Sequence, residues 1–239
     1  MIKGFKEWLI GIDTNALSKE EWLKIKLKEI EAGKSILDAG AGELKWKDYC
    51  NHLKYVSQDF AQYDPNNAET GIQIDDWEYP HIDIVSDITS IPVEDESFDV
   101  VLCTEVFEHV PNPNKALEEL IRVTKVGGTL ILTAPFSSLT HMAPFHFCTG
   151  FNKYWYKENL ESNGCIIEEC SHGGDYYTYL REEVVRLPWV AERYNGSHSI
   201  FLKIKCALLA HSLKRLIKSQ NQSEELACFR YHIVARKIQ

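Results

Sequence analysis

The sequence predicts an α/β fold built on a largely parallel sheet, and three features of the chain indicate it. The apolar pair Ile36-Leu37 ends in Asp38 and is followed by Gly40 and Gly42, the pattern of a buried strand that turns tightly into a helix. Residues 98–103 form a continuous apolar run, which is typical of a strand buried on both faces. Strand and helix patterns then alternate along the chain, which indicates right-handed crossover connections.

A helix is predicted before the first strand. Ser18 and Glu21 have the spacing of a capping box, and Gly33 is placed to end the helix. Its apolar face is formed by Leu23, Leu27 and Ile30. After the glycine turn, residues 43–52 are expected to form a helix whose first N–H groups face a ligand.

The middle of the chain supplies four further strands. We expect the second over residues 53–60 and the third over residues 82–88, separated by a long surface loop at 61–80 that is rich in Asp, Asn, Gly and Pro. The fourth is the apolar run already named. Asn112-Pro113 then caps and starts a helix, which Gly127-Gly128 ends before a fifth strand at residues 129–133.

The C-terminal third continues the same pattern with one interruption. Asn152 caps a helix that ends at Asn163-Gly164, and residues 165–167 and 227–235 form the last two strands. Between them, residues 171–224 carry helical patterns broken at Pro188 and at Asn195-Gly196. The last of these patterns is basic, and we interpret its charges as a solvated helix face rather than a membrane or acidic-partner surface. These charges are Lys203, Lys205, Lys214, Arg215 and Lys218.

Composition excludes some classes of protein. The 239 residues carry a net charge of −9, which argues against a general nucleic-acid binder. No apolar run approaches the roughly 20 residues of a membrane span. The seven cysteines contain no C-x-x-C pair, which favours reduced thiols in a cytoplasmic protein. Cys165, Cys170 and His172 lie close in sequence, but the two cysteines bracket a strand pattern, so we expect no zinc there.

The glycine turn favours a cationic ligand over a dinucleotide. A dinucleotide site needs G-x-G-x-x-G, and Lys45 stands at the third glycine position. Asp38 would repel a pyrophosphate, but it would attract the ammonium and sulfonium of S-adenosylmethionine. Asp59 ends the second strand, where such folds place a carboxylate that accepts from ribose hydroxyls. This spacing alone suits a nicotinamide cofactor equally well. The turn resembles the first motif of class I S-adenosylmethionine-dependent methyltransferases.

Three later stretches extend the resemblance to most of the chain. Residues 87–101, 105–110 and 127–131 resemble the next landmarks of this family, in family order and at family spacing. The likeness, to methyltransferases of type 11, spans about residues 34–170 plus the last strand. It implies a Rossmann-like, seven-stranded, mostly parallel sheet with helices on both faces and an antiparallel last strand.

The resemblance also implies one methyltransferase domain over residues 1–239. The expected core is about 34–170 plus 225–239. Residues 1–33 would form N-terminal helices, and about 171–224 a helical insertion.

The resemblance implies a site for the methionine end of S-adenosylmethionine. Asp38 and the backbone of Ala39 and Gly40 would hold this end of the cofactor. Backbone carbonyls near Cys103 and Thr104 would meet its ammonium group.

The nucleoside end has its own implied residues. Asp59 would hold the ribose and Phe60 would pack on the adenine. Asp87 would accept a hydrogen bond from the adenine amino group. The backbone N–H of Ile88 would donate one to a ring nitrogen. Gly42 would let the ligand approach the backbone.

Methyl transfer to a hydroxyl or amine can need a base. His109, His141 and His146 are the catalytic candidates. Glu105, Glu108 and His109 also have the E-x-x-E-H spacing with which ubiquinone-pathway O-methyltransferases and small-RNA 2′-O-methyltransferases hold a divalent ion. We interpret this motif as a helix cap and a packed histidine, and expect no metal.

The acceptor is inferred by analogy. Residues 133–156 resemble methyltransferases of cell-surface polysaccharide assembly, which favours O-methylation of a small molecule or a glycan. Aromatic residues between 136 and 156, with part of 171–224, would form the acceptor pocket. A metal-dependent 2′-O-methyltransferase, a non-catalytic S-adenosylmethionine-binding partner subunit and a nicotinamide oxidoreductase remain the alternatives. The acceptor, the methylated atom and the oligomeric state stay open.

Overall fold

The computed structural model describes residues 14–65, 71–72, 77–196, 199–217 and 222–239. These residues form two compact units. The larger unit comprises Glu21–Ser171 and Arg230–Gln239 and contains the sheet. The smaller is built mainly from His172–Phe229.

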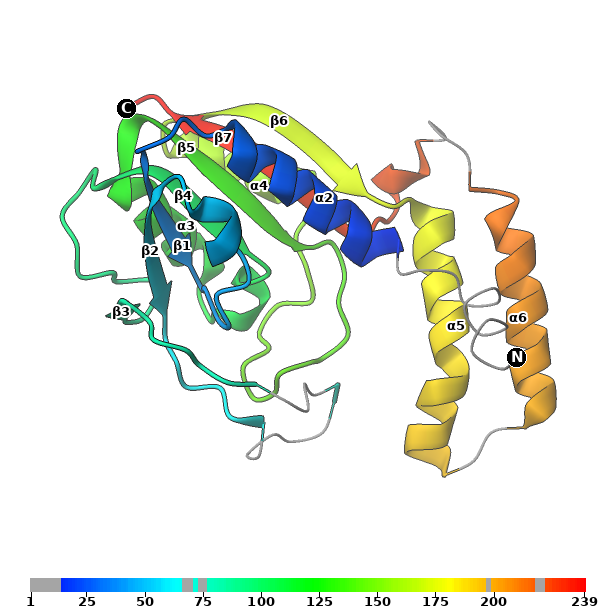
Figure 1. Ribbon diagram of the computed structural model, residues 1–239. Coiled ribbons are helices and arrows are strands. Elements are labelled where there is room, and N and C mark those ends of the chain that lie inside the picture. The colour runs from blue at the N-terminus through cyan, green and yellow to red at the C-terminus, as the bar shows by residue number, and fades with distance from the viewer. Residues whose placement is uncertain (1–13, 66–70, 73–76, 197–198, 218–221) are drawn as a thin grey trace. The chain divides into compact units, whose positions relative to one another are not determined.

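The sheet has seven strands in the order β3-β2-β1-β4-β5-β7-β6 (Figure 1). Strands β1 to β5 pair in parallel, and β7 pairs antiparallel with β5. The predicted fold class is therefore confirmed, including the antiparallel last strand. The strands are β1 (Ser35–Ala39), β2 (Lys54–Asp59), β3 (Ile84–Val85), β4 (Phe98–Thr104), β5 (Thr124–Pro135), β6 (Cys165–Gly173) and β7 (Arg230–Lys237).

Helices cover both faces of this sheet (Figure 1). On one face, Leu23 and Leu27 of α2 (Thr14–Glu29) pack in one cluster with Ile36 of β1 and Leu102 of β4. On the other, α3 (Pro113–Val123) lies against β4 and β5, and α4 (Lys153–Ser162) packs beside α3. Successive strand side chains point to opposite faces, so both Ile36 and Leu37 are fully buried. Burial on both faces explains why the strands are apolar without alternation.

The predicted helix over residues 43–52 is not formed. Turns occupy residues 42–46, and a short 3₁₀ helix, η1 (Lys47–Cys50), follows. Leu44 has φ +59°, a left-handed conformation that a helix cannot accommodate. Its N–H donates to Ala41 O, three residues back, rather than four. The segment after the glycines therefore has no helix N-terminus to present to a ligand.

Two other helix boundaries differ from the prediction. Asn112 caps α3 as expected, because its side chain accepts from the N–H of Lys115 at 3.1 Å. The helix nevertheless ends at Val123, and Gly127-Gly128 lies within β5, beside an irregularity in the β4–β5 register. At the N-terminal end, α2 begins at Thr14, so Ser18 lies inside the helix. A serine within a helix can bond to its own preceding turn, and S-x-x-E alone does not define a start.

The smaller unit contains α5 (Tyr176–Asn195) and α6 (Ile200–Lys214), which pack against each other. Pro188 lies inside α5 and does not break it, although a proline removes one helical hydrogen bond. Gly196 ends α5 in the left-handed conformation, as predicted. Among the described residues, no helix has the length and apolarity needed to cross a membrane.

Candidate active site

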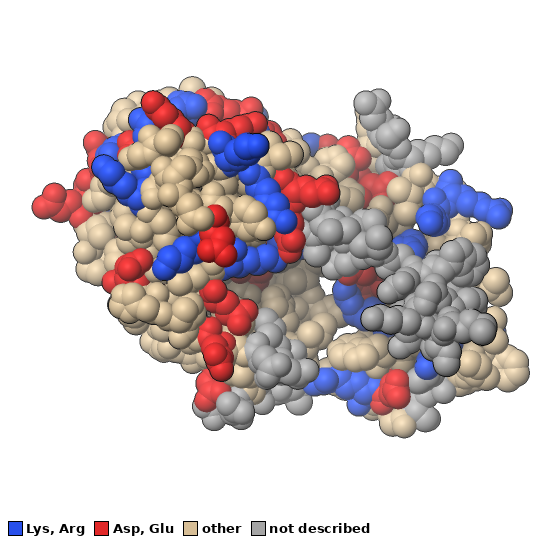
Figure 2. Space-filling model, viewed as in Figure 1, with Lys and Arg blue, Asp and Glu red and all other residues tan. Residues whose placement is uncertain are grey.

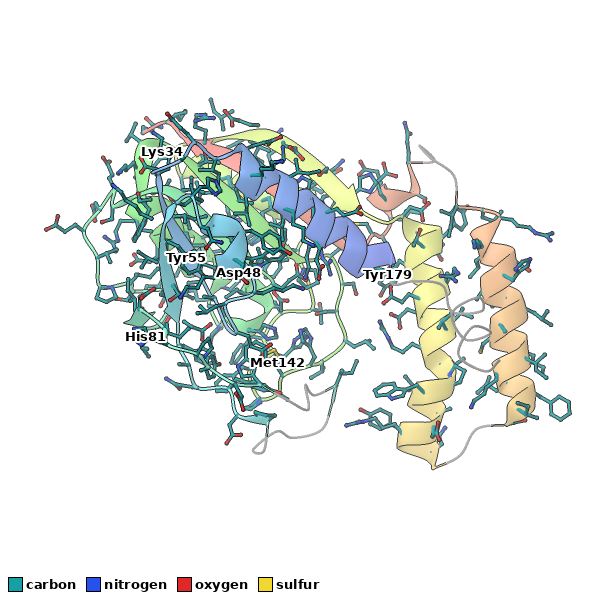
Figure 3. All side chains as sticks on the ribbon, in the orientation of Figure 1. Lys34, Asp48, Tyr55, His81, Met142 and Tyr179 are labelled. Carbon is teal, nitrogen blue, oxygen red and sulfur yellow. The ribbon has the colours of Figure 1, made fainter. Side chains whose placement is uncertain are left out.

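A cavity of about 330 Å³ lies at the carboxyl ends of the parallel strands. Met142 lines it, whereas Lys34, just before β1, lies at the opposite end of the sheet (Figure 3). Ligands of open α/β sheets bind at this edge because the connecting loops converge there. The segments that follow β1, β2, β3 and β4 all contribute to its wall. The predicted cofactor residues that line it are Gly40, Gly42, Asp59, Phe60, Asp87 and Ile88.

The backbone of the glycine turn is bonded within the protein. The N–H groups of Gly40 and Ala41 donate to Gln58 O at 2.8 and 2.9 Å, and that of Gly42 donates to Asp59 Oδ2 at 2.9 Å. A Cβ on Gly40 would lie 2.3 Å from Val106, and one on Gly42 would lie 2.9 Å from Trp77. The glycines are therefore needed because wall residues of the cavity pack directly against them.

Asp59 joins the glycine turn to the cavity. It is 6% exposed and accepts from the N–H groups of Gly42 and Ala61, both at 2.9 Å. Burial raises the pKa of its carboxyl, while these backbone bonds oppose the rise. Each carboxylate oxygen has two lone pairs, so the group can accept further bonds from a ligand in the cavity.

Asp38 does not line the cavity. It is 1% exposed, and Tyr55 Oη donates to its Oδ2 at 2.6 Å. Burial raises the pKa of Asp38 to about 7, the Tyr55 bond opposes the rise, and Asp59 adds to it. Ala39, Cys103 and Thr104 are likewise absent from the cavity wall. The role of these four residues at the methionine end of a cofactor stays a prediction.

Asp38→Asn is expected to stabilise the protein increasingly as pH rises from 5 to 8. A carboxyl whose folded-state pKa is raised binds its proton more tightly in the native state. Its contribution to stability is therefore lost between the unfolded pKa near 4 and the folded value of about 7. The amide keeps an acceptor for Tyr55 and carries no charge. The gain at pH 8 is on the order of a few kcal/mol, measurable by thermal unfolding. An exposed control, Asp48→Asn, should show no such trend, and equal trends would contradict the interpretation.

Aromatic side chains form much of the cavity wall. Phe60 and Phe145 meet edge to face with ring centroids 5.0 Å apart. Trp77 makes the same kind of contact with Tyr63 and with Tyr79, each at 5.8 Å. The sequence interpretation treated residues 61–80 as a surface loop and missed these three. Their signal was the presence of aromatic residues in an otherwise polar segment.

Part of the predicted acceptor pocket packs against other parts of the protein instead of lining the cavity. Phe136 packs against Tyr231, and Phe151 and Trp155 pack together and against Phe107. None of Phe136, Phe151 and Trp155 lines the cavity, whereas Phe145 and Phe147 do. Residues 172–224 belong to the smaller unit, and their predicted share in the pocket stays a prediction.

The E-x-x-E-H motif does not converge on a common point. Glu105 Oε1 accepts from Thr133 Oγ1 at 2.8 Å, and its Oε2 lies 3.2 Å from Arg230 Nη2. Glu108 is 1% exposed, and its Oε1 lies 3.8 Å from His109 Nε2. The carboxylate of Glu105 is thus directed to β5 and β7 rather than to His109.

His109, His141 and His146 lie together beside the cavity. His109 ends η3 (Phe107–His109) and lines the cavity, and the other two come from the loop before α4. The ring centroid of His141 lies 4.6 Å from that of His109 and 4.9 Å from that of His146. Burial lowers the pKa of His109 to about 4 and also lowers that of His146. Burial thus favours the neutral form of both imidazoles.

Comparisons with known proteins show what this chain is similar to. Residues 37–132 match the family model described as a methyltransferase domain. A demethylmenaquinone methyltransferase of Renibacterium salmoninarum is 34% identical over 121 residues, which are 47% of this chain and 48% of that protein. The chain spans about half the length of the curated relatives it matches.

Two solved structures share the fold. One, described as a candidate methyltransferase of Bacillus halodurans, has a TM-score of 0.53 and 18% identity, over 91% of this chain and 98% of that one. The other is phosphoethanolamine N-methyltransferase 2 of Haemonchus contortus in complex with S-adenosyl-L-methionine, with a TM-score of 0.51 and 15% identity, over 98% of this chain and 56% of that one. Residues 37–132 are therefore similar to a methyltransferase domain, and the seven-stranded sheet has the fold of these two structures.

Proposed function

We propose that the protein transfers a methyl group from S-adenosylmethionine to a small-molecule acceptor, at an oxygen atom. One observation carries the proposal. Four residues that the family resemblance assigns to the nucleoside line a single cavity at the carboxyl edge of the sheet, and three histidines stand beside it. The four are Asp59, Phe60, Asp87 and Ile88.

The residues present fit this cofactor. The cavity of about 330 Å³ lies at the lower end of the range of small-molecule sites, roughly 300–1,000 Å³. Asp59 would accept from the ribose hydroxyls, Phe60 would offer a ring face to the adenine, and Asp87 would accept from its amino group. In its ionised form, the buried Asp38 would contribute negative charge toward a cationic ligand. When bound, S-adenosylmethionine supplies a methyl group on an already activated sulfonium.

The protein's own part is positioning and proton removal. Transfer from a sulfonium is an in-line displacement, and holding the acceptor close to the methyl group can supply much of the rate. A hydroxyl acceptor must also lose its proton. His109 lines the cavity, and His141 and His146 stand directly beside it, so these side chains are the proposed site of deprotonation. Neutral imidazole is the form that accepts a proton.

The aromatic wall favours a flat acceptor. Rings of Trp77, Tyr79 and Phe145 face the cavity, and such surfaces stack on aromatic rings and on the apolar faces of sugars. The quinone precursor named for the Renibacterium relative is one acceptor of this kind, and a sugar-containing acceptor is another. On the face seen in Figure 2, acidic and basic side chains are interspersed over the larger unit. This mixture, with the net charge of −9, gives no support to a nucleic-acid acceptor.

Two measurements test the proposal. Calorimetry should show binding of S-adenosylmethionine, and labelled methyl from it should pass to at least one phenol, quinol, nucleotide sugar or lipid in a panel that also contains RNA. Absence of cofactor binding would refute the proposal. Binding without transfer to any member would favour the non-catalytic subunit. Selective binding of a nicotinamide cofactor would favour an oxidoreductase.

A further inference from the structure

Three histidines form a cluster with the geometry of metal ligands. Among the described residues, His109, His141 and His146 are the one group of three His, Cys, Asp or Glu side chains whose potential ligand atoms all lie within 4.8 Å of one another. His109 comes from η3, directly after β4, while His141 and His146 come from one loop after β5. The cluster therefore joins two segments that are separated in sequence and adjacent in the sheet.

The loop that carries two of the histidines is attached at both ends. The N–H of Met142 donates to Ile72 O at 3.1 Å, and the N–H of Phe147 donates to Glu108 O at 2.8 Å. Backbone bonds thus hold the loop against η3, so the approach of the imidazoles does not depend on the side chains alone.

Two of the imidazoles are oriented as metal ligands usually are. His109 Nδ1 lies 2.5 Å from Phe145 O, and His141 Nδ1 lies 2.9 Å from Leu139 O. A carbonyl oxygen can only accept, so each Nδ1 carries a hydrogen, which leaves Nε2 as the atom able to bind a metal ion. Metal-bound histidines typically donate their second N–H to a backbone carbonyl or a carboxylate, which fixes the ring orientation.

His146 provides an independent observation. Both of its ring nitrogens are shielded from solvent, and neither has a hydrogen-bond partner in the described part of the chain. A shielded polar atom without a hydrogen-bond partner destabilises the folded protein. A cation bound between the three rings would give one of these nitrogens its partner.

We propose that His109, His141 and His146 bind one divalent transition-metal ion, with Zn²⁺ as the best fit. Imidazole nitrogen is a preferred ligand of zinc, whereas Mg²⁺ and Ca²⁺ prefer oxygen. Zn–N bonds of about 2.0–2.1 Å in a tetrahedral site place the nitrogens about 3.4 Å apart. Because the potential ligand atoms lie within 4.8 Å of one another, the cluster must contract by up to about 1.4 Å on binding. Three histidines leave the fourth position open.

This site differs from the E-x-x-E-H site considered from the sequence. Glu105 bonds to Thr133 and Arg230, and only His109 is common to both sets. The proposal replaces the expectation that no metal is needed. If the proposed methyl transfer holds, an ion at the open position lowers the pKa of a bound acceptor hydroxyl and so assists its deprotonation. Binding of the ion itself does not depend on that activity.

The experiment measures metal binding directly on the full chain, with any histidine tag removed. After dialysis against a chelator, Zn²⁺ is titrated by calorimetry, and bound metal is counted by elemental analysis. We expect one ion per chain. We also expect Co²⁺ to bind in its place with the visible absorption of a tetrahedral site. His141→Ala and His146→Ala should each weaken Zn²⁺ binding by at least about tenfold. His81→Ala is the matched control, because that side chain is 90% exposed and away from the cluster.

Two results would overturn the proposal. One is the absence of stoichiometric Zn²⁺ binding by the unaltered protein. The other is undiminished binding by His141→Ala and His146→Ala, which would place the ion elsewhere, for example on the seven free cysteines. Circular dichroism and the thermal unfolding midpoint show that each variant is folded. If His146→Ala does not fold, Zn²⁺ binding by His141→Ala alone tests the proposal. Zinc binding without any binding of S-adenosylmethionine would refute the proposed function and leave the metal site standing.

Discussion

Replacing Asp59 with Ala is expected to weaken binding of S-adenosylmethionine by roughly 10- to 150-fold. Hydrogen bonds to a charged acceptor contribute about 1.5–3 kcal/mol, and the ribose hydroxyls would lose such an acceptor. The same substitution removes the bonds that Asp59 accepts from Gly42 and Ala61. The glycine turn then loses one of its bonds to the end of β2, while the bonds from Gly40 and Ala41 to Gln58 O remain. Calorimetric titration of the variant with S-adenosylmethionine measures the loss.

Two variants make this result specific. Asp48→Ala removes a carboxylate that is exposed outside the cavity (Figure 3) and should leave affinity unchanged. Asp59→Asn keeps one carbonyl oxygen for the backbone and should lie between the unaltered protein and Asp59→Ala. Unchanged affinity in a folded Asp59→Ala protein would remove Asp59 from the site and, with it, the main support for the cofactor assignment.

The elements that the sequence predicts correctly depend on local or strongly patterned signals. The apolar run of β4 is buried on both faces of the sheet, and a continuous apolar run of this length is typical of such a strand. Asn112 and Asn152 cap their helices through bonds to residues three positions later, so the evidence for each cap lies in the adjacent sequence. The alternation of strand and helix patterns along the chain indicates right-handed crossovers between parallel strands.

The errors arise where tertiary contacts decide the local conformation. The turn after Gly42 continues through Leu44 in a left-handed conformation that leucine propensity alone does not indicate. Trp46 and Cys50 in this segment are buried in the cluster with α2, so packing compensates for the lost helix. In the same way, packing between α5 and α6 keeps Pro188 within a continuous helix.

The sequence predicts several single residues of the candidate site, but not the contacts that bring the others to it. Asp59, Phe60 and Asp87 could be placed because each follows a strand, and parallel strands end at one edge of the sheet. The contributions of Trp77 and Tyr79 depend on contacts with residues distant in sequence, such as Tyr63 and Gly42, which no local pattern indicates.

The three histidines could be named as candidates from their chemistry. Their meeting depends on the bonds between the 140–147 loop, Ile72 and Glu108, which no short window of sequence contains.

The second large effect is expected on the rate of methyl transfer when the histidines of the cluster are replaced. His109→Ala, His141→Ala and His146→Ala should leave the affinity for S-adenosylmethionine within about twofold, because none of the three replaces a proposed cofactor contact. At least one of them should lower kcat for methyl transfer by roughly 10²-fold or more, the contribution typical of assisted proton removal. The measurement is single-turnover transfer of labelled methyl to the acceptor found in the panel.

His81→Ala serves as the matched control for the reaction. It removes an exposed histidine that does not belong to the cluster. Treatment with a chelator distinguishes a role of the metal ion in the reaction from a role of an imidazole alone. If the ion takes part, prior chelation should lower kcat of the unaltered protein by a similar factor, added Zn²⁺ should restore it, and the weakened variants should respond to neither. If an imidazole acts alone, chelation should have no effect on kcat, while the substitutions should still lower it.

Near-normal transfer by all three variants would show that the acceptor loses its proton to water, and the histidine cluster would then have no part in the reaction.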